Sequence, residues 1–208
     1  MRTKTLLLTA VLSVAAAASS MADVFSVNVV GYVNTVLRPG FNMIANPLRG
    51  TNNGINTLIP TPGVGSLLYK LGASGSFDQI AENFGPGNWD VNLTLAPGEG
   101  AFIQVPALTT NTFVGEVIQG TTTNNIPAGF SIRSSIVPQS AGLTGVGGLE
   151  FPAVTGDIVF LFNAATQAYS IHEYFGPNWD VLPVPAVGQS FWVQKAAPAS
   201  WVRTFNVN

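Results

Sequence analysis

The segment Phe84-Gly85-Pro86-Gly87-Asn88-Trp89-Asp90 returns about 90 residues later as Phe175-Gly176-Pro177-Asn178-Trp179-Asp180. Flanking segments match in the same order. Gly40-Phe41 corresponds to Gly129-Phe130, and Gly98-Glu99-Gly100-Ala101-Phe102-Ile103-Gln104 corresponds to Gly188-Gln189-Ser190-Phe191-Trp192-Val193-Gln194. Such a repeat indicates an internal duplication with a folding unit of roughly 90 residues. We therefore predict two tandem homologous units, residues 23–120 and residues 121–208.

Short runs rich in β-branched and aromatic residues, bounded by Gly, Pro, Asn or Ser, dominate the chain and predict strands. With 22 Gly and 14 Pro among 208 residues, few windows could hold a helix, and we expect only a helical turn near residues 53–58. Strands about ten residues apart are typical of sandwiches and barrels. We therefore predict an all-β fold of two β-sandwich or barrel-like units. The predicted strands cover residues 24–30, 65–71, 101–105, 112–117, 158–162, 191–195 and 201–207.

We place the boundary between the units near residues 120–125. The run Thr121-Thr122-Thr123-Asn124-Asn125 is polar and brief, which predicts a turn and not a flexible tether. Each unit should open with a strand, because residues 24–33 precede Pro39-Gly40-Phe41 as residues 113–118 precede Pro127-Ala128-Gly129-Phe130. The strand at 112–118 would then close the first unit while opening the second, so that the two units form a continuous body.

The first residues predict an export signal. Arg2 and Lys4 form a basic start, residues 6–18 are a nearly unbroken apolar run, and Ser20-Met21-Ala22 ends in the small-x-small pattern that signal peptidase accepts. A retained anchor would need about 20 apolar residues to cross the hydrocarbon core, and this run is shorter. We therefore predict that residues 1–22 are cleaved and that the mature chain starts at Asp23 without a membrane segment. The expected location is the periplasm, the cell surface or the medium.

Sparse charge restricts the classes of partner. Only 9% of the residues are charged, and after loss of Arg2 and Lys4 six basic residues remain beside ten acidic ones. Nucleic-acid binding needs clustered Lys and Arg, which here stand singly, so no nucleic-acid partner is expected. The chain has no Cys, so its stability must come from packing, for which 13 Phe supply material. A surface of Asn, Thr, Ser and Gln is common on exported proteins that assemble, adhere or bind neutral glycans.

Part of the chain resembles a group of exported, largely uncharacterised bacterial proteins. The resemblance is carried by Val29-Val30-Gly31-Tyr32-Val33, Gly40-Phe41-Asn42-Met43-Ile44-Ala45-Asn46-Pro47-Leu48, Pro97-Gly98-Glu99-Gly100-Ala101-Phe102 and Phe113-Val114-Gly115-Glu116-Val117. Such proteins combine a signal peptide with β-rich modules of this type. The second unit follows the pattern loosely, with Ile132-Arg133-Ser134-Ser135 in place of the Ile-Ala-Asn-Pro segment. The resemblance implies export and an all-β module, and it transfers no functional residue.

The repeated loops are the candidate ligand site. Gly and Pro preset a tight turn, Trp supplies a flat apolar face, and Asn and Asp supply hydrogen-bonding groups beside it. A sugar ring could stack on the indole while its hydroxyls meet the amide and the carboxylate. Alternatively, the Trp side chains fill the cores of their units and the Asp side chains close the turns by bonding backbone amides. The candidate residues are Asn88, Trp89, Asp90, Asn178, Trp179 and Asp180.

Catalysis finds little support in the sequence. A carboxylate pair for glycoside hydrolysis could come from Glu82, Asp90, Glu173 and Asp180, yet no spacing selects one. The only His, His172, corresponds to Ala81 in the first unit and has no Gly-x-Ser-x-Gly motif to accompany it. A His or Cys metal site is excluded, and no Asp-x-Asp run indicates calcium. We expect no enzyme activity, no catalytic residue, no metal and no cofactor.

The predicted function is that of a secreted, non-catalytic structural, adhesion or assembly protein of the cell envelope or surface. The alternative is a glycan-binding module that uses Trp89 and Trp179. A third expectation is self-association through edge strands. The strands at 24–33 and 201–207 carry Arg203 as their single charge, so charge protects their edges poorly. Addition of one chain's terminal strand to another's sheet would follow.

Overall fold

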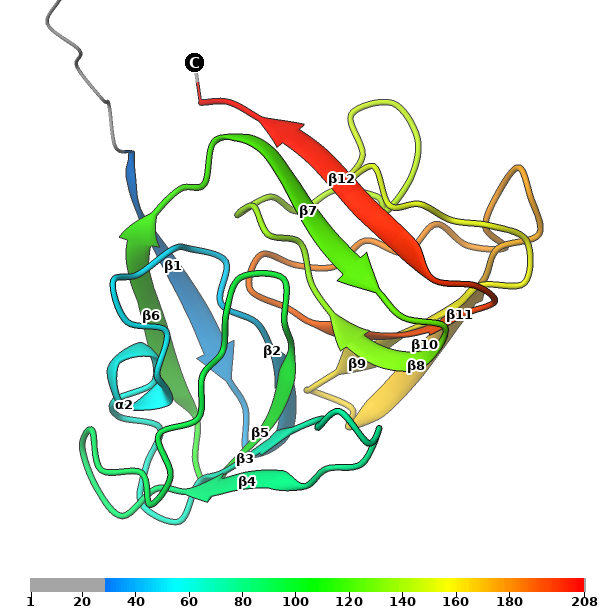
Figure 1. Ribbon diagram of the computed structural model, residues 1–208. Helices are drawn as coiled ribbons and strands as arrows, with labels where there is room; N and C mark the ends of the chain where they lie inside the picture. Colours follow the sequence, from blue (N-terminus) through cyan, green and yellow to red (C-terminus); the bar gives the residue numbers. More distant parts are fainter. Residues whose placement is uncertain (1–28, 208) are drawn as a thin grey trace, which may run out of the picture.

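The computed structural model describes residues 29–207. Within this range the chain forms twelve β-strands and one short helix, which confirms the predicted all-β fold. Figure 1 shows the strands of the first half of the chain on one side of the molecule and those of the second half on the other. The predicted signal peptide, residues 1–22, lies outside the described residues, and so does the part of the predicted opening strand that precedes residue 29.

The first half builds two β-layers. A ribbon pairs β1 (Val30–Leu37) with β6 (Thr109–Glu116), and a four-stranded antiparallel sheet runs in the order β2-β5-β3-β4. A single helical turn, α2 (Ile55–Leu58), lies within the range predicted for it. The strands of the sheet are β2 (Gly40–Ile44), β3 (Leu67–Lys70), β4 (Gln79–Glu82) and β5 (Ala101–Val105).

The second half repeats this arrangement. Its ribbon pairs β7 (Gly120–Ile126) with β12 (Ala199–Phe205), and its sheet runs in the order β10-β9-β11-β8. Each strand from β7 to β12 thus has the same neighbours as its counterpart among β1 to β6, which supports the predicted duplication. The strands of this sheet are β8 (Gly129–Arg133), β9 (Ile158–Asn163), β10 (Ala168–Glu173) and β11 (Phe191–Lys195).

A hydrophobic core fills each half between its ribbon and its sheet. Successive side chains of a strand point to opposite faces, so each strand sends alternate residues into this space. Each fully buried large side chain stabilises the fold by about 1.5–3 kcal/mol. Matched residues line the two cores: Leu37 and Ile103 with Trp89 in the first, Ile126 and Val193 with Trp179 in the second.

Two predictions about the middle of the chain are wrong. The run Thr121-Thr122-Thr123-Asn124-Asn125, predicted as a turn, lies inside β7, which pairs with β12 along its whole length. Threonine is β-branched and favours strands, and a ribbon with one exposed face tolerates polar residues there. No single strand at 112–118 serves both halves, since β6 closes the first and β7 opens the second. The terminal strand of each half therefore pairs with its own opening strand.

The two halves meet through reciprocal contacts. The backbone N–H of Ser134 donates to the Gly98 carbonyl at 3.1 Å, and that of Ala45 donates to the Gly188 carbonyl at 2.8 Å. Gly98 and Gly188 occupy matched positions in the repeat, and so do Ser134 and Ala45. Matched contacts in both directions are the mark of an isologous interface. The halves therefore pack as a pseudo-twofold pair within one chain.

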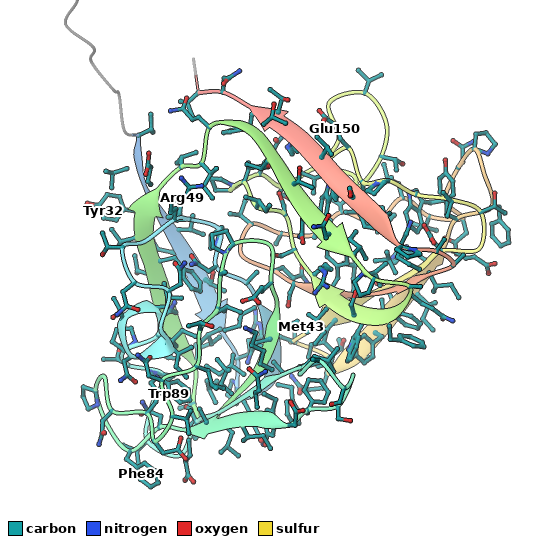
Figure 2. All side chains as sticks on the ribbon, viewed as in Figure 1. Tyr32, Met43, Arg49, Phe84, Trp89 and Glu150 are labelled. Atoms are coloured by element: carbon teal, nitrogen blue, oxygen red, sulfur yellow. The ribbon has the colours of Figure 1, made fainter. Side chains whose placement is uncertain are left out.

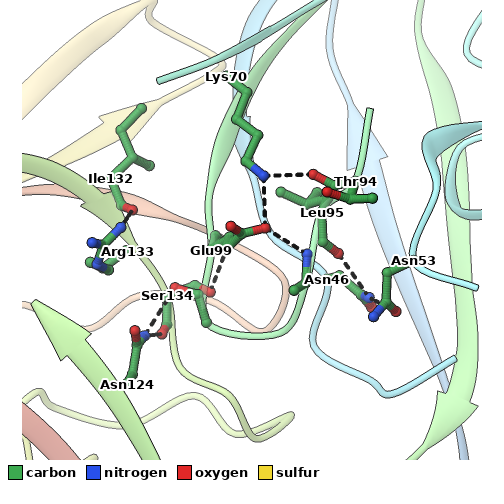
Figure 3. A network of polar contacts seen from close by, with 12 residues as sticks. Asn46, Asn53, Lys70, Thr94, Leu95, Glu99, Asn124, Ile132, Arg133 and Ser134 are labelled. Carbon is green, nitrogen blue, oxygen red and sulfur yellow. Dashed lines mark hydrogen bonds and ion pairs between the residues drawn. The ribbon is translucent and has the colours of Figure 1, made fainter. Parts of the chain in front are cut away.

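Side chains of both halves hold this junction (Figure 3). Ser134 Oγ donates to the Glu99 carbonyl at 3.0 Å, and Asn124 Nδ2 donates to the Gly98 and Ser134 carbonyls at 2.9 and 3.1 Å. Within the first half, the Glu99 carboxylate binds Lys70 Nζ at 2.8 Å and so holds the side chain of this junction residue in place. These hydrogen bonds and the apolar contacts among Met43, Phe102, Ile132 and Phe162 both cross the junction. The fold therefore fixes the position of one half relative to the other. This placement positions the site described below.

Candidate functional site

Both repeated Trp side chains lie in the cores. Trp89 and Trp179 expose 4% and 7% of their surface, and Figure 2 shows Trp89 inside the first half while Phe84 projects at its outside. The indole N–H of Trp89 donates to the Ile59 carbonyl at 2.9 Å, and that of Trp179 donates to Thr144 Oγ1 at 3.1 Å. Neither indole presents a face on which a sugar ring could stack. The geometry favours the core-filling alternative for these two residues.

Asp90 and Asp180 close the repeated loops. Asp90 Oδ1 accepts the backbone N–H groups of Glu82 and Val91 at 2.8 and 2.7 Å. Asp180 Oδ1 accepts the matched N–H groups at 3.1 and 2.6 Å. Bonds from backbone N–H groups to an ionised carboxylate are among the stronger hydrogen bonds in proteins. Both carboxylates therefore fasten the loop to the end of the neighbouring strand.

Asn88 and Asn178 are exposed in the same loops. Their backbone carbonyls accept the N–H groups of Phe84 and Phe175 at 2.9 and 3.0 Å. The three candidate residues of each loop are consecutive in the sequence, but the indole is buried and the carboxylate is bound to backbone N–H groups. A glycan site would have to lie elsewhere on the surface.

His172 is also held by local partners. It is 7% exposed, with Nδ1 2.8 Å from the Val181 carbonyl and Nε2 3.0 Å from Ser170 Oγ.

Over residues 29–207, no three side chains of His, Cys, Asp or Glu gather where they could hold a metal ion. Across the same residues, the chain has no helix of the length and apolar character that a membrane crossing requires.

The outward faces of the two four-stranded sheets carry apolar rows where a solvent-facing sheet would carry polar residues. Strand pairing aligns Met43 with Phe102, Phe102 with Tyr69, and Tyr69 with Ile80, one residue from each strand. The second sheet aligns the matched residues in the same way. The first row is therefore Met43, Phe102, Tyr69 and Ile80, and the second is Ile132, Trp192, Phe160 and Ile171.

Each row runs from the junction into solvent. Met43 and Ile132, on the strands nearest the other half, are 5% and 2% exposed and belong to a small core between the halves. Ile80 and Ile171, on the outer strands β4 and β10, are 47% and 60% exposed. The surface that joins the two halves therefore continues, without a change of chemistry, onto the exposed edge of each sheet.

Nine aromatic rings form one connected network over these rows. Each ring lies within 5.0–6.4 Å of another ring, centroid to centroid, and most of the pairs are edge-to-face. Such pairs are worth about 0.5–1.5 kcal/mol beyond the area they bury. We call the two rows together with these rings the aromatic surface. The rings are Phe41, Tyr69, Phe77, Phe102, Phe130, Phe160, Phe162, Tyr169 and Trp192.

An open groove of about 680 Å³ lies in the aromatic surface between the two halves. Phe77, from the β3–β4 loop, contacts Phe102 of its own sheet and Trp192 of the other, at centroid distances of 5.9 and 5.8 Å. No lining residue carries a charge at neutral pH. The residues that line the groove are Phe41, Tyr69, Phe77, Ile80, Phe102, Phe162, Gln167, Tyr169 and Trp192.

Gln167 fastens the two walls of the groove to one another. Its Oε1 accepts the Phe41 N–H at 2.9 Å and its Nε2 donates to the Phe41 carbonyl at 2.9 Å. The side chain therefore pairs with β2 as a neighbouring strand would. Beside it, burial raises the pKa of the Tyr169 phenol, and a hydrogen bond with the Trp192 side chain opposes that shift. The groove is thus preformed, neutral and largely apolar.

The aromatic surface was not predicted from the sequence. The signal was present in strands that are apolar on both faces, such as Ala101-Phe102-Ile103-Gln104-Val105, which indicate burial or contact on both sides. The repeated motif favoured Trp89 and Trp179 as stacking residues, whereas the half-buried Trp192 lies in the groove.

Comparisons with protein-family models, with curated proteins and with solved structures find no significant match to this chain.

Proposed function

We propose that the chain is an exported, non-catalytic assembly protein of the cell envelope or surface, and that its aromatic surface binds a second copy of the same chain. One observation carries the proposal. The exposed end of each apolar row is continuous with the part of the row that already binds a homologous half inside the molecule. A surface that packs against one half of this type is suited to pack against a half of the same type in a second copy of the chain.

The outer strands add a second reason. Within residues 29–207, β4 and β10 each pair with one strand and end their sheets, and each presents an exposed Ile toward solvent. Unpaired strand edges beside apolar side chains are templates for pairing with another chain. Ile80 and Ile171 are therefore placed to be covered when two copies meet edge to edge.

The scarcity of charged residues favours a neutral partner. The groove is lined by uncharged residues, and only 9% of the chain is charged. Contiguous exposed apolar surface on an exported protein marks an interaction site. Its partner should present a largely apolar surface, because a polar surface would lose its hydrogen bonds to water there without replacement. A second copy offers a surface of this chemistry.

The test is sedimentation velocity of the mature protein over a range of concentrations. The expected result is reversible formation of dimers or larger species. The double variant Phe41→Ser/Phe130→Ser changes two matched residues that are 39% and 55% exposed, and it should remain monomeric at concentrations where the natural chain assembles.

The matched control is Tyr32→Ser/Phe84→Ser, which removes two exposed aromatic side chains outside the aromatic surface, 72% and 56% exposed. The control should assemble like the natural chain. A natural chain that stays monomeric, or a control that loses assembly as completely as the Phe41/Phe130 variant, would overturn the proposal.

A neutral glycan is the second candidate for the same groove. It is favoured by Tyr69, Tyr169 and Trp192, whose rings can stack on sugars and whose polar groups can form hydrogen bonds. Trp192 is half-buried while the other three Trp side chains are buried, so a glycan should change the emission of Trp192 alone. A monomeric natural chain whose emission shifts with soluble polysaccharide, and a Trp192→Phe variant without the shift, would select this candidate.

A further inference from the structure

One buried ion pair in the second half has no counterpart in the first. Lys195, at the end of β11, and Asp157, immediately before β9, form a salt bridge in which both side chains are fully buried. The Lys195 ammonium also donates to the Pro152 carbonyl at 2.6 Å and lies 5.3 Å from the centre of the Phe151 ring. The pair is thus sealed in an apolar, aromatic environment.

The first half builds the matched sheet without such a pair. Strand register matches Lys195 with Val105 and Asp157 with Ser66, and these two residues are also buried, at 1% and 0% exposure. A valine and a serine therefore fill in the first half the places that the ions fill in the second. Buried ion pairs add little stability compared with apolar residues of similar size, because both ions lose their hydration.

We propose that Lys195 and Asp157 join through an intramolecular amide bond, a modification site that is independent of the proposed assembly. The groups required for condensation are an amine and a carboxyl group in contact and shielded from water. Shielding matters because water competes as a nucleophile and favours the hydrolysed state. The carboxyl is also held in a single orientation, since Val154 N–H donates to Oδ2 at 2.8 Å and Ala196 N–H donates to Oδ1 at 3.1 Å.

The step balances without a further reactant. A proton passes from Lys195 Nζ to Asp157 Oδ2 along their hydrogen bond, and the resulting amine attacks Cγ. Negative charge then develops on Oδ1, where the Ala196 N–H stabilises it. A second proton moves from Nζ to Oδ2, the Cγ–Oδ2 bond breaks, and one water molecule leaves. The product is an Nζ–Cγ amide whose remaining N–H stays beside the Pro152 carbonyl.

The bond would tie β9 to β11 at the point where their pairing begins. Gln194 and Ile158 are the paired residues at this end of β11 and β9, so Lys195 and Asp157 lie directly next to that pair. A cross-link of this kind closes a loop of the chain and restricts the unfolded state as a disulfide does. In a chain without Cys, it supplies the covalent connection that exported proteins often take from disulfides.

The test is the intact mass of the purified, folded mature protein, followed by trypsin digestion after denaturation. The expected intact mass is one water below that of the sequence. Lys195 is the only Lys or Arg between Arg133 and Arg203, so an amide at Lys195 should leave residues 134–203 as a single tryptic product. A succinimide at Asp157 would also lose water but would allow cleavage after Lys195, so the digest distinguishes the two.

The control is the double variant Lys195→Val/Asp157→Ser, which carries the residues found at the matched positions of the first half. It should fold, show the full mass of its sequence, and migrate more slowly than the natural chain on a denaturing gel, because no covalent loop compacts it. A natural chain of full mass that trypsin cleaves after Lys195, and that migrates with this variant, would overturn the proposal.

Discussion

At the scale of single residues, the repeated Trp side chains are components of folding. Trp89 combines near-complete burial with a bond from its indole N–H to the Ile59 carbonyl, so its loss removes both packing and a partner for a buried carbonyl. Trp179 is buried to a similar degree, with its indole N–H bonded to Thr144 Oγ1, so the motif is repeated where a core needs to be filled. Repetition of a motif within a chain is thus weak evidence for a ligand site.

We expect Trp89→Ala to lower the free energy of unfolding by about 3–5 kcal/mol, since it leaves a large cavity in the core. Phe84→Ala, in the same loop but 56% exposed, should change the free energy by no more than about 0.5 kcal/mol. Urea unfolding followed by circular dichroism measures both. Equal stability of the two variants would contradict the assignment of Trp89 to the core.

Tyr169 makes stability depend on pH in the alkaline range. Burial raises the pKa of its phenol in the folded chain above the ordinary value of 10.0, against a smaller opposing effect of the hydrogen bond with Trp192. The unfolded chain therefore releases this proton first, and stability falls as pH rises from 10.0 toward the folded-state pKa. Unfolding by urea at a series of alkaline pH values should show a shallower decline for Tyr169→Phe than for the natural chain. An unchanged slope in the variant would disprove this contribution.

At the scale of elements, the junction is tightest where matched residues meet. Gly100 and Ser190 correspond in the repeat, and a Cβ atom added to Gly100 would collide with the side chains of Ser190 and Ile132. Residues near a twofold axis contact their own counterparts. Here one residue of the matched pair, Gly100, has no side chain. The absence of a side chain at Gly100 lets the two halves approach.

We expect Gly100→Ala to destabilise the chain by about 1–3 kcal/mol, as overpacking of a filled interior does. At Gly75, where an added Cβ meets no atom within 4 Å, the φ of +79° provides a contrasting control whose cost comes from backbone strain alone. Thermal unfolding of both variants, with Trp192 emission as a probe of the junction, distinguishes the causes. Only Gly100→Ala should change the Trp192 environment before unfolding, and the reverse pattern would refute the close approach.

The elements also show what the sequence predicts and what it leaves out. The strands at residues 101–105 and 191–195 were predicted with the bounds that β5 and β11 have, because compact apolar runs between turn residues carry a strong signal. The strand β7 was missed because its residues are polar, and only its pairing with β12 shows that they are extended. The aromatic surface was missed because it requires strand order and register, which bring Phe102 beside Tyr69 only in the sheet.

At the scale of the whole molecule, the chain resembles a dimer whose two subunits have been joined. Each half has its own core, and the halves share a smaller one made of Met43, Phe102, Ile132 and Phe162. Their contacts are reciprocal, with backbone bonds from Ala45 to Gly188 and from Ser134 to Gly98. Such an interface holds its parts in place whether or not a peptide bond connects them.

We therefore expect residues 23–119 and 120–208, expressed together as two chains, to form a one-to-one complex. The break falls between β6 and β7, which belong to different ribbons, so no strand pairing is interrupted. Separation of the chains adds the entropy cost of association, about 4–15 kcal/mol at the 1 M standard state, so the complex should dissociate on dilution while each half keeps its core. Co-purification through a tag on one half, followed by size-exclusion chromatography, measures this.

Substitution of Gly100 by Val in the first chain should abolish co-purification, because the added side chain would collide with Ser190 and Ile132. If the halves instead purified separately without this substitution, the junction would be a consequence of the covalent link and not an interface in its own right.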